Sequence, residues 1–127
     1  MDSKAFERIV HDAVESLPER FRSLITNVAF LVEQWPDKET LRDMEIDSPY
    51  DLLGLYRGVP LEERGFAYGN QLPDTICIYQ KPVEAWCEDT GEDLADTIRG
   101  TVIHEVGHFF SLSDEEMEQI EKEAGLL

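Results

Sequence analysis

Two histidines and a glutamate stand within five residues, in the order His104-Glu105-Val106-Gly107-His108. On a helix, residues four apart are separated by about 40° around the axis, so both imidazoles would point to one side. Neutral imidazole is a frequent ligand of zinc, and a carboxylate beside such ligands can take a proton from water. The spacing therefore predicts a divalent metal, Zn²⁺, between His104 and His108, with Glu105 as a general base.

This chemistry requires a helix over the motif, and residues Thr90–Phe110 have the pattern of one. We expect Thr90 or Asp89 to cap it and its apolar stripe to face the core, with both histidines pointing away. Gly100 and Gly107 each cost about 1 kcal/mol in a helix, which predicts close approach of another backbone there. The stripe consists of Leu94, Ala95, Ile98, Val102, Val106 and Phe109.

A catalytic zinc usually has three protein ligands and an open position for water, so one more ligand is needed. Asp114 is the nearest candidate, six residues after His108. Its carboxylate can reach the metal if the helix ends near Phe110 or Ser111 and the chain turns back. A left-handed conformation at Ser111 would make this turn, at a cost of about 1 kcal/mol for a residue other than glycine.

The residues around Asp114 also fit a second role. The run Ser113-Asp-Glu-Glu116 is typical of a capping box that begins a helix, in which Asp114 would be favourable beside the helix dipole. The two roles are compatible. Glu115, Glu116 and Glu118 are weaker alternatives for the third ligand.

The pattern His104-Glu-x-x-His108-x-x-Ser111-x-x-Asp114 resembles the HExxHxxGxxD motif of the minimal zincin-like metallopeptidases, with serine in place of the motif glycine. The segments Leu52–Arg64 and Leu72–Tyr79 extend the resemblance. It implies an α+β domain with a small mixed β-sheet, an HExxH active-site helix and further helices. It also implies that His104, His108 and Asp114 are the metal ligands and Glu105 the catalytic base.

By the same resemblance, an extended peptide or protein substrate would pair with the exposed edge of the sheet. We expect the strand Thr75–Gln80 to form that edge. The implied reaction is hydrolysis of a peptide bond by water activated on the metal. Tyr56, Arg57, Tyr68 and Tyr79 are candidates for stabilising its transition state, without a choice among them.

Two other functions fit the same residues. The domain could be a non-catalytic metal-binding or interaction module of zincin fold, in which the metal stabilises the fold or docks a basic partner. It could also be an amidase or other zinc hydrolase of a small molecule. The latter needs a closed pocket, which a chain of this length is too short to build without a dimer.

The remaining elements follow from periodicity, Pro and Gly. We expect turns and short strands around Ser48-Pro-Tyr-Asp and the glycines 54, 58, 65 and 69. The expected helices and strands are a helix over about the first sixteen residues, a short helix over Glu19–Ile25, a strand over Asn27–Glu33, one or two helical turns over Asp37–Met44, the strand Thr75–Gln80, and a short helix from Pro82 through Trp86.

Composition narrows the setting. A chain of 127 residues fits a single domain, 1–127, and a net charge of −17 disfavours nucleic acid and anionic membranes as partners. We find neither a segment long enough to span a membrane nor the features of a secretory signal. Cys77 and Cys87 are therefore expected to be reduced, in a cytoplasmic protein. The oligomeric state is left open.

Overall fold

The computed structural model describes residues 1–23, 25, 27–58 and 74–123. Within them, strands β1 (Val28–Glu33), β2 (Gly54–Arg57) and β3 (Asp74–Tyr79) form a mixed sheet in the order β1-β3-β2. β1 is parallel to β3, with Phe30 opposite Ile76, whereas β2 is antiparallel to β3. The expected mixed sheet is confirmed.

The position of β3 corrects one expectation. Thr75–Gln80 was expected to form the exposed edge of the sheet, but β3 has a strand on each side. Its backbone groups are therefore used by its neighbours, and the edge strands of the described sheet are β1 and β2.

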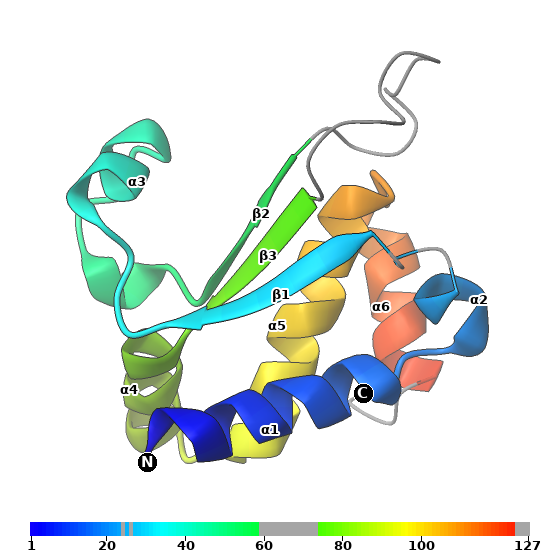
Figure 1. The fold of residues 1–127 in the computed structure, drawn as a ribbon, viewed down its shortest axis with the longest axis horizontal. Helices are drawn as coiled ribbons and strands as arrows, with labels where there is room; N and C mark the ends of the chain where they lie inside the picture. Colours follow the sequence, from blue (N-terminus) through cyan, green and yellow to red (C-terminus); the bar gives the residue numbers. More distant parts are fainter. Residues whose placement is uncertain (24, 26, 59–73, 124–127) are drawn as a thin grey trace.

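Helices surround the sheet, which confirms the α+β class (Figure 1). The first helix is amphipathic, and the side chain of Asp2 caps it by accepting a hydrogen bond from the backbone N–H of Ala5 at 3.0 Å. The helices are α1 (Ser3–Glu15), α2 (Glu19–Arg22), α3 (Lys38–Asp43), a 3₁₀ turn η1 (Pro49–Asp51), α4 (Gln80–Thr90), α5 (Leu94–Phe109) and α6 (Asp114–Glu123).

The two faces of the sheet are covered differently (Figure 1). On one face α1 and α5 form the main core with β1 and β3, because the side chains of alternate strand residues point there. Phe6, Ile76, Ile78 and Val102 are fully buried in it. On the other face, Cys77 and Tyr79 of β3 and Leu52 form a smaller cluster, against which three half-buried side chains pack: Leu41, Ile46 and Leu55.

The segment before the helix that carries the HExxH motif differs from expectation. Two helices were predicted, one from Pro82 through Trp86 and one over Thr90–Phe110, and the chain forms two, but α4 continues to Thr90 and the break lies at Gly91, which has φ +76°. Asp93 is the cap of α5, where its side chain accepts a hydrogen bond from the N–H of Asp96, and neither Thr90 nor Asp89 has this role. Likewise α4 begins at Gln80 instead of Pro82.

The two helical glycines of α5 are also explained differently. A Cβ atom added at Gly107 would lie 2.4 Å from Sδ of Met117 on α6, so a side chain, and not another backbone, requires the glycine. A Cβ added at Gly100 would meet nothing within 4 Å among the described atoms. Gly107 therefore sets the close contact between α5 and α6.

Several predictions concern residues that the structure leaves undescribed. These are the turns at glycines 65 and 69, Tyr68, and the parts of the resembling segments that fall within 59–73. In the described ranges, no helix has both the length and the apolar character to cross a bilayer.

Candidate metal centre

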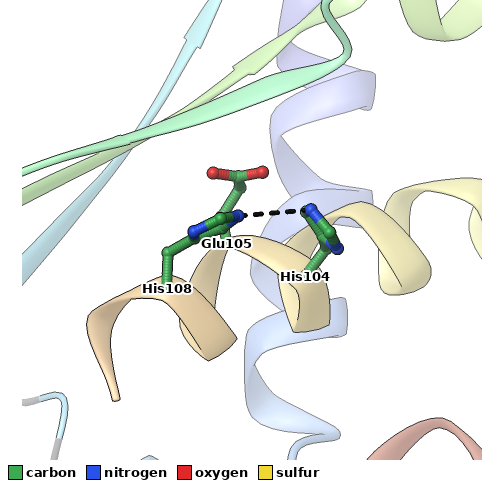
Figure 2. A group of neighbouring side chains, drawn as sticks. All are labelled: His104, Glu105 and His108. Carbon is green, nitrogen blue, oxygen red and sulfur yellow. Dashed lines mark hydrogen bonds between the residues drawn. The ribbon is translucent and has the colours of Figure 1, made fainter. Parts of the chain in front are cut away.

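The two histidines of the motif lie on the last two turns of α5, exposed and side by side (Figure 2). Their Nε2 atoms are 3.2 Å apart. Two nitrogens bound to one zinc at about 2.0–2.1 Å with a tetrahedral angle are separated by about 3.3 Å. His104 and His108 therefore already have the separation of a chelating pair, and α5 points both rings away from its buried side as the sequence predicted.

Glu105 lies beside this pair but faces the sheet (Figure 2). Glu105 is only 7% exposed. One of its carboxylate oxygens and one ring nitrogen each of His104 and His108 all lie within 4.8 Å of one another. Burial raises the pKa of Glu105 because it disfavours the charged form, while the neighbouring histidines act in the opposite direction. The residue is thus a carboxyl group at the edge of the protein interior, directly adjacent to the candidate ligands.

The backbone of β2 holds Glu105 in place. The N–H of Tyr56 donates a hydrogen bond to Oε1 of Glu105 at 2.8 Å. The C=O of Leu53 accepts a hydrogen bond from the N–H of Tyr79. In the residues that follow, the main-chain N–H and C=O groups therefore point alternately toward β3 and away from it, and those of Tyr56 point away from β3. The edge of the sheet therefore donates directly to the carboxylate between the two histidines.

Gly54 brings β2 this close to α5. A Cβ at this position would lie 2.8 Å from the Cγ2 atom of Thr101 and 3.4 Å from Cγ of Glu105. A glycine inside a strand often marks such a close approach, so the isolated Gly54 was a usable signal in the sequence. The hydrogen bond from the main chain of Tyr56 has no sequence signal of its own, because any residue except proline supplies an N–H.

The chain reverses immediately after the second histidine. Ser111 has φ +54°, the left-handed conformation expected of it, and the N–H of Leu112 donates to Gly107 O at 2.9 Å. This pattern is a Schellman turn, in which glycine is the usual left-handed residue. The serine in place of the motif glycine therefore keeps the turn and carries its strain.

The predicted capping box then begins α6. Ser113 Oγ accepts from the N–H of Glu116, and the carboxylate of Glu116 accepts from the N–H of Ser113. Asp114 is the first residue of α6 and is exposed. It stands outside the group formed by His104, Glu105 and His108. Its role as the third ligand stays a prediction.

The geometry agrees with a comparison of the sequence with known families. The family model of zincin-like metallopeptidases matches residues 25–124. The chain belongs to this family. No curated protein sequence matches it. Membership in the zincin-like family implies a metal-dependent, peptidase-like protein, and the group of His104, Glu105 and His108 is able to hold that metal.

A groove opens beside the candidate metal centre of this zincin-like chain. Its volume is about 710 Å³, and both His104 and Glu105 line it. Residues 51–54, which lead into β2, form one side, and α5 contributes a row of residues from its N-terminal half. The groove is large enough for several residues of an extended chain, and Gly54 is its lining residue from β2.

The residues considered for transition-state stabilisation lie elsewhere. The hydroxyl of Tyr56 donates to Asp74 at 2.7 Å, and its ring contacts Phe109. Arg57 donates to Thr40 on the α3 side of the sheet, and Tyr79 is buried in the small cluster on that same face. Tyr68 is outside the described residues. These described side chains do not line the groove.

Proposed function

We propose that the chain is a zinc-dependent peptidase in which His104, His108 and Asp114 bind the metal and Glu105 is the general base. One observation carries the proposal: the Nε2 atoms of His104 and His108 are 3.2 Å apart, beside a buried glutamate that lines a groove. The reversal at Ser111 supports Asp114, because it turns the chain back directly after the second histidine.

Zinc bound there would supply a Lewis acid that polarises the scissile carbonyl and acidifies water. Glu105 takes one proton from the attacking water and delivers it to the amide nitrogen as the carbon–nitrogen bond breaks, so that one water is consumed and an acid and an amine are formed. Burial, which raises the pKa of Glu105, suits this carboxyl group to holding a proton between the two transfers. The Tyr56 N–H fixes its position.

The proposed substrate is an extended peptide or protein segment that pairs with β2. In the register of the sheet, Gly54 faces outward as Tyr56 does, so its N–H and C=O point along the groove side of the edge. Peptides commonly bind exposed strand edges through main-chain hydrogen bonds, with side chains in adjacent pockets. A backbone bound in this way would lie next to Glu105.

The substitution Glu105→Gln tests the catalytic role. Zinc-loaded protein is incubated with a mixed peptide library, and products are identified by mass spectrometry while bound metal is measured by elemental analysis. Loss of a general base should lower the rate by about 10²–10⁴ and leave one zinc per chain. Glu7→Gln, on the exposed side of α1, is the control for the same charge change and should cleave normally.

The same assay separates the alternative function. If the unaltered zinc-loaded protein binds one metal but cleaves no peptide in the library, the chain is a non-catalytic metal-binding module and the peptidase proposal is wrong. If Glu105→Gln cleaves as fast as the unaltered protein, a peptidase activity exists but Glu105 is not its base.

A separate measurement tests the ligand set. His104→Ala should abolish stoichiometric zinc binding, and Asp114→Asn should weaken it by at least tenfold because a charged ligand is lost. Glu115→Gln removes the neighbouring charge of α6 and should have little effect. Equal zinc affinities of Asp114→Asn and Glu115→Gln would remove Asp114 from the site.

A further inference from the structure

The groove beside the candidate metal centre is lined by carboxylates and, among the described residues, by no lysine or arginine. Apart from Glu105, its acidic lining residues come from three separate parts of the fold: Asp51 of η1, Glu92 just before α5 with Asp96 in its first turn, and Glu121 of α6. Because they surround one cavity, their potentials add inside it.

These charges are only partly compensated within the described chain. Asp96 has Arg99 at 3.5 Å, and the indole N–H of Trp86 donates to Glu92 at 2.5 Å without neutralising it. Asp51 and Glu121 form no ion pair with any described residue. The groove therefore keeps a negative potential that a bound cation would relieve.

Apolar and aromatic side chains also line the groove. Leu52 and Trp86 line the groove, and the Trp86 side chain is 46% exposed. An exposed indole can contact the aliphatic part of a long side chain, and its face attracts a cationic head group. This combination fits the side chains of lysine and arginine, which have an apolar stem and a charged end.

Resting on the proposed function, we propose that the groove selects peptides that carry a lysine or arginine next to the bond to be cleaved. The metal centre fixes where the backbone lies, and the groove beside it receives the basic side chain. The overall charge of −17 would attract any cation weakly. The groove differs in that its carboxylates line the same cavity as His104 and Glu105.

Binding without cleavage tests the selection. Trp86 becomes the sole fluorescent tryptophan when Trp35 is replaced by phenylalanine, and Glu105→Gln prevents turnover. Zinc-loaded Trp35→Phe, Glu105→Gln protein is titrated with a blocked peptide containing one lysine, and with the same peptide in which that lysine is acetylated. We expect the lysine peptide to bind about tenfold more tightly, and the ratio to shrink as salt rises from about 0.02 M to about 0.5 M.

Variants locate the effect. Asp51→Asn with Glu121→Gln should reduce the preference for lysine by roughly fivefold, about what two partly exposed carboxylates can contribute. Asp12→Asn with Glu7→Gln makes the same charge change on α1 and should leave the preference intact. If Asp51→Asn does not fold, as judged by circular dichroism, Glu121→Gln alone is compared with Glu7→Gln and should show about half the effect on a logarithmic scale.

Equal affinity for the two peptides, or an equal loss of preference in the groove and α1 variants, overturns the selection. Cleavage by the protein with Glu105 intact is measured in parallel. A lysine preference in binding without any cleavage would sustain the selection and contradict the peptidase function. Cleavage at equal rates with and without lysine would sustain the peptidase function and contradict the selection.

Discussion

The two faces of the sheet perform different tasks. The face toward α1 and α5 has the large core and the candidate metal centre, whereas the face toward α3 has a small cluster around Cys77 and Tyr79. β2 belongs to both, since Tyr56 bonds Glu105 through its backbone while Leu55 packs in the small cluster. The comparison shows that a buried carboxyl group can be positioned by a strand whose other face packs only in a small cluster.

The largest expected effect probes how closed the small face is. Burial raises the pKa of the Cys77 thiol from 9.0 to about 12, with a smaller contribution from Glu33. At pH 8 the reactive thiolate should be roughly a thousandfold rarer than in the unfolded chain. Labelling with a thiol reagent, followed by peptide mass spectrometry, should therefore be about that much slower for Cys77 in the native protein than in urea.

The same shift gives a pH dependence. Since the folded state keeps the proton on Cys77 longer than the unfolded state, the thiol's contribution to stability is complete below about pH 9 and is lost as pH rises toward about 12. Cys87, which is half-buried, serves as the internal reference in the labelling experiment. Rapid labelling of Cys77 in the native protein would mean that the α3 side of the sheet opens readily. The view that this small cluster is closed to solvent would then be wrong.

A matched pair of truncations measures the two faces directly. Ile78 is fully buried on the α5 side, and Ile78→Ala should lower the free energy of unfolding by about 3 kcal/mol through lost burial and a cavity. Leu41→Ala, in the half-buried cover of the other face, should cost about 1 kcal/mol. Urea denaturation checks both values. Similar losses would show that the small cluster is as important to stability as the main core.

The glycines of α5 sharpen the contrast within the larger face. Gly107→Ala should lower the free energy of unfolding by about 1–2 kcal/mol, because the new methyl group overlaps Met117. Gly100→Ala has open space and should raise it by about 1 kcal/mol through helix propensity. Thermal denaturation of the two variants gives the comparison. Changes of the same sign would mean that α6 moves aside without cost.

The smallest effects concern backbone strain, which is found at one residue on the α5 side of the sheet and at one residue on the α3 side. Ser111, after α5, and Glu45, after α3, are the described non-glycine residues with positive φ, at +54° and +56°. Ser111→Gly and Glu45→Gly should each stabilise the protein by at most about 1 kcal/mol, because glycine adopts this conformation freely but loses more entropy on folding. Unequal shifts in melting temperature would show that one turn is better supported by its surroundings.

Local patterns predicted the parts of the molecule that depend on neighbouring residues. The spacing of His104 and His108 on a helix, the left-handed Ser111 and the capping box at Ser113 all follow from interactions within a few positions of the chain. Two helices with a break between Trp86 and Thr90 were expected, but α4 extends to Thr90 and the break lies at Gly91. The residues between Trp86 and Gly91 are compatible with a helix as well as with a cap, so the local pattern leaves the exact boundary open.

Sheet order could not be predicted in the same way. The apolar run of β3 is typical of a buried strand and fits a central position, yet nothing in it names its neighbours, which lie more than fifteen residues away in sequence. The link between Tyr56 and Glu105 depends on this order, since β2 must be an edge for its N–H to be available. The candidate ligands could therefore be predicted from the sequence, whereas the hydrogen bond from Tyr56 that holds Glu105 could not.

The hydrogen bond from Tyr56 to Glu105 also has a consequence for solubility. An uncovered strand is a template for polymerisation with other copies of the same chain, and proteins often prevent this with a charged group that points toward it. Glu105 occupies one main-chain donor of β2, and α5 packs against Gly54. Glu105 thus leaves the outward main-chain groups of Gly54 and the C=O of Tyr56 for a bound peptide, so that this short edge can pair only over a few atoms. Replacement of Glu105 by alanine, which cannot accept the hydrogen bond, should make aggregation more frequent.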